Sequence, residues 1–160
     1  MTPESSETTK AARARALVTG RAFGVLATNS KRSPGYPFAS VMPYMADAEG
    51  RPVFLLSRLA VHTKNVIEGP RASLLVFEEG AEEDPLNSAR LNLMGEVRRL
   101  PESEDADTRA AYVARHPDAA EWLEFGDFGL YRMEVADVYY IGGFGAMGWV
   151  SKGDYATAPA

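Results

Sequence analysis

The residue types best suited to chemistry lie together in one short segment of the sequence, Ser57–Asn65. There a predicted strand, Val53–Ser57, gives way to a predicted short helix, Leu59–Glu68. Unpaired backbone amides at the start of a helix point outward and favour an anion. Hydroxyl, guanidinium, ammonium and imidazole groups accompany them, from Ser57, Thr63, Arg58, Lys64 and His62. Together these donors predict a cradle for a phosphate dianion.

The same spacing also fits a purely structural interpretation. Ser57 and Thr63 can act only as helix caps while Arg58 and Lys64 extend into solvent, and the spacing does not choose between the two. The other histidine, His116, lies between two predicted helices, near a helix C-terminus. A favourable interaction with the helix dipole explains it there, so we give it little functional weight.

The composition is typical of a small globular protein. The 160 residues, 46% of them apolar and 24% charged, suffice for one domain with a real core. The net charge of -5 argues against nucleic acid as the main partner, whereas a small phosphorylated ligand needs only two or three local cations. The absence of cysteine excludes disulfides, thiolate metal sites and cysteine nucleophiles. We expect a cytoplasmic protein without a membrane anchor, because no apolar run could span a bilayer and the polar start resembles no signal peptide.

Short apolar segments rich in β-forming residues predict a mainly β protein with peripheral helices. Six segments are predicted as strands: Phe23–Thr28, Phe38–Met45, Val53–Ser57, Ala72–Phe77, Ala89–Leu100 and Phe128–Ile141. Short turns such as Asp47–Gly50 join most of them, which favours a closed, six-stranded antiparallel barrel. Pro43, inside the second of these strands, indicates an edge or a bulge.

Helices are predicted at three further places. An Ala/Arg-rich helix covers Lys10–Thr19, a second starts near Ser103 and a third starts at Asp118. We expect a disordered N-terminal tail over residues 1–10, a single domain over 11–150 and a C-terminal tail over 151–160.

Two conspicuous segments carry no motif for chemistry. The Gly-rich segment Gly142–Trp149 follows a strand but has no convincing helix or second strand after it, so it is not a dinucleotide-binding loop. Its glycines would let the backbone pass close to a ligand or a partner subunit. The acidic segment Glu78–Asp84 has no histidine nearby, so we expect a solvated loop there and no metal site.

The order of these segments resembles the pyridoxamine 5'-phosphate oxidase-like, flavin mononucleotide (FMN)-binding split-barrel superfamily, in particular its haem-utilisation branch. The resemblance covers Ala11–Val150 and depends on the order of several motifs more than on any single one. The matching stretches are Tyr36–Tyr44, Leu56–Asn65, Gly69–Leu75, Asp84–Leu86, Ala89–Leu91 and Gly143–Gly145. The resemblance implies a six-stranded antiparallel split β-barrel that works as a homodimer, with cofactor sites at the subunit interface.

The resemblance also implies which residues hold FMN. The backbone of the second strand would pass beside the flavin ring, and the strand-end and helix-start residues would hold the phosphate. On the long fifth strand, where oxidase members usually carry a glutamine, this chain has Arg90, which would stabilise an anionic reduced flavin or a substrate carboxylate. The residues implied are Ser40, Val41, Met42, Pro43, Ser57, Arg58, His62, Thr63, Lys64, Asn65 and Arg90, with Trp149 as a residue that could stack on the flavin edge or merely pack on the barrel.

Three functions remain open at this point. The first is an FMN-dependent oxidoreductase with a small-molecule substrate, in which the flavin supplies the chemistry and no acid or base is identified. The second is a haem-binding protein on the same fold, with His62 as the axial ligand rather than a phosphate contact or a structural histidine. Haem-utilisation proteins often have a further C-terminal domain; since this sequence ends at Ala160, haem binding is expected more than haem degradation. The third is a non-catalytic, dimerising flavin-binding or interaction module.

Overall fold

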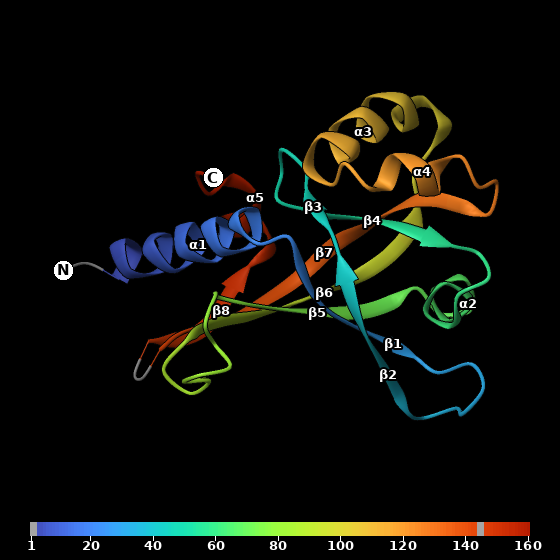
Figure 1. The fold of residues 1–160 in the computed structure, drawn as a ribbon. Helices are drawn as coiled ribbons and strands as arrows, with labels where there is room; N and C mark the ends of the chain where they lie inside the picture. The colour runs from blue at the N-terminus through green and yellow to red at the C-terminus, as the bar shows by residue number, and fades with distance from the viewer. Residues whose placement is uncertain (1–2, 144–145) are drawn as a thin grey trace.

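A computed structural model describes residues 3–143 and 146–160. The described chain forms one antiparallel sheet of eight strands in the order β2-β1-β5-β6-β7-β4-β3, with β8 paired to β7. The elements are α1 (Pro3–Gly20), β1 (Phe23–Asn29), β2 (Pro37–Pro43), β3 (Met45–Ala46), β4 (Pro52–Ser57), α2 (Val61–Glu68), β5 (Arg71–Phe77), β6 (Ala89–Arg99), α3 (Glu102–Arg115), α4 (Ala119–Leu123), β7 (Phe128–Gly142), β8 (Met147–Ser151) and α5 (Lys152–Thr157). The sheet curls around a core, with α1 and α5 at one end and α3 and α4 above β4 (Figure 1). In the residues described, no helix has both the length and the apolar character that a membrane crossing requires.

The predicted fold class is confirmed, with two more strands than expected. The predicted strand Phe38–Met45 breaks at Tyr44 into β2 and β3, and β8 was not predicted. Pro43 ends β2, which lies at the edge of the sheet as its proline suggested. The predicted turn Asp47–Gly50 joins β3 to β4 and is closed by a 2.9 Å hydrogen bond from the Gly50 amide to the Asp47 carbonyl.

Alternation of buried and outward side chains on the long strand β6 sets the two faces of the sheet. Leu91, Leu93 and Val97 are buried, whereas Asn92 and Met94 lie on the opposite face. The pairing of β6 with β7 shifts by one residue between Met94 and Gly95. A Cβ at Gly95 would lie 2.1 Å from the Glu134 carbonyl oxygen, so only glycine allows the two backbones to approach so closely here.

Both ends of the chain contain more helix than the sequence suggested. The first helix begins at Pro3 rather than Lys10, so the segment expected to be disordered is helical from Pro3 onward. Residues 151–160, expected as a tail, contain α5, whose Tyr155 is buried. The sequence did not predict α5, because its residues are small and polar. The helix packs through one buried aromatic side chain rather than through an apolar stripe.

The end of the Gly-rich segment belongs to a strand that the sequence did not reveal, β8. β8 pairs antiparallel with β7, so the two form a hairpin and not the parallel unit of a dinucleotide fold. The dinucleotide interpretation therefore fails for a different reason from the one predicted. Phe144 and Gly145, part of the motif that suggested the family, lie outside the described residues.

Candidate functional site

Ser57, the first residue of the predicted phosphate cradle, lies at the end of β4 and takes part in the turn that follows. Its hydroxyl donates a hydrogen bond to the Asp127 carboxylate and accepts one from the Leu59 amide at 3.1 Å. The Arg58 amide donates to the Asp127 carbonyl at 2.9 Å. These bonds join the turn before α2 to the segment before β7, so Ser57 has a structural role whether or not a ligand binds nearby.

Thr63 and Asn65 are buried and belong to the interior of the barrel. The Asn65 side chain donates to the Thr28 hydroxyl at 3.0 Å and accepts from the Lys31 amide at 2.9 Å, which fixes the loop between β1 and β2. The Thr63 hydroxyl is inaccessible and has no hydrogen-bond partner among the residues described. In this conformation neither side chain faces a ligand on the surface.

Arg58 and Lys64 are the two cradle residues that do extend outward. Both are exposed, and no ion pair with a carboxylate is found for either of them within the described chain. The residue before α2 is Ala60, whose side chain caps nothing, so the first amides of the helix have no side-chain acceptor. The charges and free amides that the sequence placed here are therefore present, although the hydroxyls are used elsewhere.

The two histidines differ in what their rings contact. His116 follows α3, as predicted, and its Nε2 lies 2.8 Å from the Tyr44 carbonyl oxygen while its ring packs 4.9 Å from that of Tyr112. His62, in the first turn of α2, is half-buried, and no hydrogen bond to its ring is found in the part of the chain that the structure describes. Burial lowers the pKa of His62, which keeps its imidazole neutral and able to bind a metal ion at neutral pH.

The remaining predicted residues lie on three strands: the edge strand β2, the central strand β6 and β8. On β2, Met42 is buried in the core while Val41 is 72% exposed, and Ser40 and Pro43 lie on either side of them. The Arg90 guanidinium donates to the carbonyls of Pro85, Leu86 and Ser88 at 2.9 to 3.2 Å, so it holds the loop directly before β6. Cofactor binding by these residues stays a prediction.

Strand register reveals a set of outward residues that the sequence analysis missed. Pairing aligns one residue from each of six strands on the face opposite the core. This set, called the outer row below, is Val41, Val25, Leu75, Asn92, Tyr139 and Trp149. Its one amide side chain, Asn92, lies two residues after Arg90 and has no side-chain hydrogen bond to another of the described residues. The alternation of side chains along β6 could have revealed Asn92 from the sequence, but the prediction used that alternation only to distinguish the buried face of the strand from the outward one.

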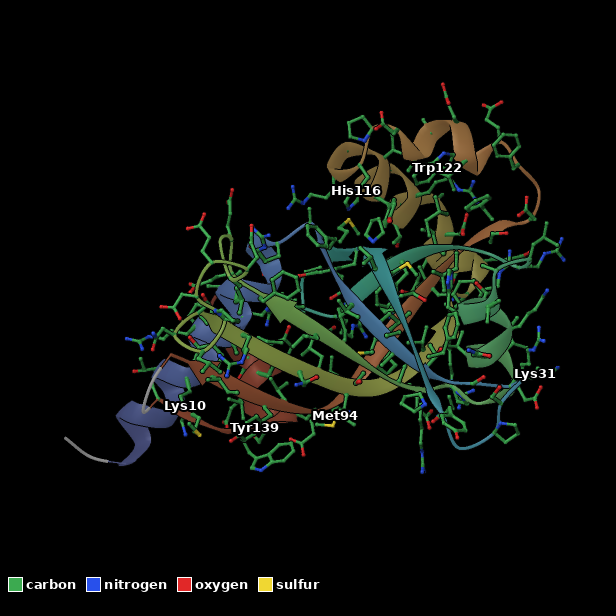
Figure 2. The ribbon with its side chains drawn as sticks, turned by 60° about the horizontal axis from the view of Figure 1, so that its bottom comes forward. Lys10, Lys31, Met94, His116, Trp122 and Tyr139 are labelled. Carbon is green, nitrogen blue, oxygen red and sulfur yellow. The ribbon has the colours of Figure 1, made fainter. Side chains whose placement is uncertain are left out.

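A shallow groove of about 890 Å³ lies beside the outer row. Its outward side chains include Ala27, Ser73 and Met94, which form the next register row across β1, β5 and β6. Met94 and Tyr139 lie on the same face of the sheet, far from His116 and Trp122 on the helical side (Figure 2). None of the residues Ser57–Asn65 lines this groove. The predicted cradle and the groove are therefore separate places.

This architecture and the sequence that forms it identify the class of protein. Residues 5–157 match the family model described as CREG, beta-barrel, so the chain belongs to the CREG β-barrel family. The predicted resemblance to the split-barrel superfamily is thereby confirmed. The fold also extends to a Listeria innocua structure described as that of a pyridoxamine 5'-phosphate oxidase candidate, with a TM-score of 0.62, 16% identity and coverage of 82% of this chain and 98% of that one.

Two relatives above 30% identity both have names that mention haem. The chain is 36% identical over 148 residues to the chloroplastic non-canonical haem oxygenase HOZ of Arabidopsis thaliana, covering 90% of this chain and 45% of that protein. It also resembles the structure of a haem-binding protein from Mycobacterium smegmatis, with a TM-score of 0.86, 34% identity and coverage of 94% of this chain and 61% of that one. The chain thus spans only about half to three-fifths of the length of these relatives.

Proposed function

We propose that this chain binds haem, with His62 as the axial ligand. The observation that carries the proposal is the state of the two histidines. His116 uses Nε2 on a backbone carbonyl, whereas His62 has a neutral, partly accessible ring without a partner among the described residues. Neutral imidazole is the form that ligates haem iron. The names of the two relatives above 30% identity support the same ligand.

In such a complex the iron would supply any redox chemistry, and this chain would bind and orient it. Burial around His62 would disfavour protonation of the ring and so protect the metal bond at mildly acidic pH. Haem degradation, the activity named for the plant relative, is not part of the proposal, because the chain covers only 45% of that protein.

Haemin titration tests this proposal directly. We expect a Soret band that shifts and saturates on binding to the wild-type protein, and loss of that shift in the His62→Gln variant. The matched control is His116→Gln, which should retain the band, with circular dichroism confirming the fold of both variants. An unchanged Soret band in His62→Gln would show that another group ligates the iron.

A second candidate, FMN, is favoured by the surface at the start of α2. Arg58 and Lys64 are exposed there without carboxylate partners within the described residues, next to amides that no side chain caps. A phosphate fits such a place because charge and amide dipoles act on it together. If FMN binds, the flavin would supply oxidoreductase chemistry towards a small-molecule substrate.

The FMN candidate is tested by quenching of flavin fluorescence. Arg58→Ala and Lys64→Ala should each weaken FMN affinity, whereas Arg32→Ala, which removes an exposed cation from the loop between β1 and β2, should not. Equal affinity in all four proteins would remove the phosphate site from consideration. A protein that is isolated colourless and binds neither ligand would support the non-catalytic module instead.

The quaternary structure we propose is a homodimer formed through the outer row. Large apolar side chains on a sheet face, such as Val41 at 72% and Trp149 at 59% exposure, are unfavourable in water and suit a second copy of the same surface. A ligand beside this face would then lie at the subunit boundary. We keep the cytoplasm as the expected compartment, and the absence of cysteine is compatible with a reducing one.

A further inference from the structure

We propose that one end of the barrel docks reversibly on an anionic lipid surface. This end, called the basic end below, consists of α2 with the turn before it, the loop between β1 and β2, and the first residue of β5 (Figure 1). Such a contact is peripheral and needs no membrane-spanning helix. It goes beyond the proposed function, because it involves neither iron nor the His62 ring.

The outward face of α2 carries bulky apolar side chains where a surface helix ordinarily carries polar ones. Val61, Lys64 and Ile67 recur every three residues, so they form one outward stripe, opposite the buried residues of the helix. Val61 is 48% exposed and Ile67 is 62% exposed. Leu59, in the turn before the helix, is 72% exposed, and Tyr36, on the loop between β1 and β2, is 71% exposed. Apolar side chains that are exposed as a group mark an interaction surface.

Polar contacts hold the loop between β1 and β2 against α2. The Lys31 amide donates to the Asn65 side-chain oxygen at 2.9 Å, and the Lys31 ammonium pairs with the Glu68 carboxylate at 2.6 Å. Tyr36 closes the loop, because its carbonyl accepts from the Ser30 amide at 3.0 Å. The exposed side chains of the helix and of the loop therefore belong to one surface.

The cations of the basic end outnumber its carboxylates. Residues 30–36 and 58–71 contain five exposed cations and one carboxylate, Glu68, which pairs with one of the five. A further carboxylate, Asp127, lies beside the turn and accepts the Ser57 hydroxyl, so the local charge stays positive. The five cations are Lys31, Arg32, Arg58, Lys64 and Arg71, the last of which also lines the groove beside the outer row, as Lys152 does.

A run of negative charge lies at the other end of the sheet. Strand β5 begins at Arg71 in the basic end and leads to Glu78–Asp84, which contains five carboxylates and no cation (Figure 1). Figure 2 likewise places Lys31 at the end of the molecule away from Lys10. The seven residues of β5 span roughly 20 Å, more than twice the Debye length of about 8 Å at physiological ionic strength. The acidic run therefore does not cancel the positive potential of the basic end, and repulsion would turn it away from a negative surface.

The mixture of the two kinds of side chain favours lipid over a protein partner. Arg58 precedes Leu59, and Lys64 lies between Val61 and Ile67 on the stripe, so each exposed apolar group of α2 and its turn has a cation beside it. The core of a protein interface is depleted of charged residues. A lipid surface has phosphates above acyl chains and therefore accepts cations and apolar side chains together. The cytoplasmic face of a membrane is negative, as this contact requires.

Binding of the haem-free protein to vesicles tests the proposal. We expect the wild type to cosediment with phosphatidylcholine vesicles that contain about 30% phosphatidylglycerol, not with pure phosphatidylcholine, and to be released by about 0.5 M NaCl. Leu59→Ser combined with Ile67→Ser should weaken binding about tenfold, and Arg32→Gln about fivefold. The matched controls are Leu86→Ser, at a position 74% exposed in the loop between β5 and β6, and Arg13→Gln, at an exposed position of α1. Both should bind as the wild type does.

The outcomes separate this surface from the haem site. Absence of wild-type binding to the anionic vesicles overturns the proposal, as does equal binding to neutral vesicles or binding that Leu59→Ser with Ile67→Ser leaves unchanged. Circular dichroism establishes that each variant is folded. If the double substitution instead converts an oligomer to a monomer without lipid present, the stripe contacts a second copy and the lipid assignment is overturned. The haemin titration of His62→Gln decides the proposed function independently of all these results.

Discussion

Two regions of the molecule differ in which of their groups are buried and which are exposed to water. The terminal junction, formed by α1, α5 and the turn Asp47–Gly50, buries a charged side chain whose two terminal nitrogens donate to backbone carbonyls, while its Nε has no hydrogen-bond partner among the residues described. Arg15 is 3% exposed and donates to the carbonyls of Tyr155 at 2.9 Å and Ala156 at 3.1 Å, and to that of Ala48. The outer row and its groove instead leave large apolar side chains and two cations in contact with water.

The difference separates groups that stabilise the fold from groups that are available to bind a ligand. A group whose partners lie within its own chain is already neutralised, so it contributes to folding and has little left to offer a ligand. A group left without a partner at the surface costs little in the isolated chain and can gain from binding. By this criterion the side chains of Arg90 and Ser57 have partners within the chain, as in the junction. The side chains of Arg71, Lys152 and Asn92 have none among the described residues. Substitutions in the two regions should therefore differ in whether they change stability or binding.

The largest effect on stability is expected from Arg15→Met. The variant leaves the carbonyls of the C-terminal helix and of the Asp47–Gly50 turn without their donor, in a place that excludes water. We expect a loss of about 3 kcal/mol in the free energy of unfolding, measured by urea denaturation. Arg13→Met, at an exposed position of the same helix, should change it by less than about 0.5 kcal/mol. Similar values for the two variants would show that the buried guanidinium is not needed.

A smaller loss is expected from Tyr155→Phe. The hydroxyl donates to the Gly50 carbonyl at 2.6 Å in the buried centre of the junction, and burial raises its pKa, so it stays protonated and able to donate. Removing it should cost about 1 to 1.5 kcal/mol. Tyr36→Phe is the control, because Tyr36 is 71% exposed and its hydroxyl is solvated in the folded and unfolded states alike. An equal loss in both would contradict the role assigned to the Tyr155 bond.

The sequence predicted the barrel because local signals and tertiary structure agree there. Short β-branched and aromatic segments between turn residues mark the central strands correctly, and alternation along β6 identified its buried face. It failed where stability depends on distant contacts. The local signal for the helix Lys152–Thr157 is only its cap, in which the Ser151 hydroxyl accepts from the Asp154 amide at 3.1 Å. Its tertiary support comes from Arg15, a residue 140 positions away from Tyr155.

The site was harder to predict for a related physical reason. The sequence correctly placed free amides and cations at the start of α2, because those depend on neighbours in the chain. It could not reveal that Asp127 would take the Ser57 hydroxyl, or that Thr28 and the Lys31 amide would take the Asn65 side chain. The outer row and the groove depend on the register of six strands, and that register is known only from the folded structure.

His62 shares a property with each region. It is half-buried, and its ring has no hydrogen-bond partner in the described chain. Its pKa is lowered by burial in the folded state, so the unfolded chain binds more protons once the pH falls to about 6.5 and below. The contribution of His62 to stability is therefore complete above that pH and is lost as the pH falls through it. The free energy of unfolding should decline less between pH 7.5 and 5.5 in His62→Gln than in the wild type. If the free energy of unfolding, measured by urea denaturation, declines equally in the two proteins, burial does not lower the pKa of His62.

The smallest effect on stability, and the clearest on association, is expected from Val41→Lys. Val41 is 72% exposed and Leu86 is 74% exposed, but only Val41 belongs to the outer row. Because both side chains are already in water, Val41→Lys and Leu86→Lys should each change the free energy of unfolding of the monomer by less than about 0.5 kcal/mol. If two copies meet through the outer row, a lysine at position 41 brings like charges together in an apolar contact, so sedimentation should show a monomer. Leu86→Lys should remain dimeric at the same concentration. A wild-type protein that sediments as a monomer, or a Val41→Lys variant that stays dimeric, would remove the outer row from the subunit interface and leave its exposed apolar surface to another partner.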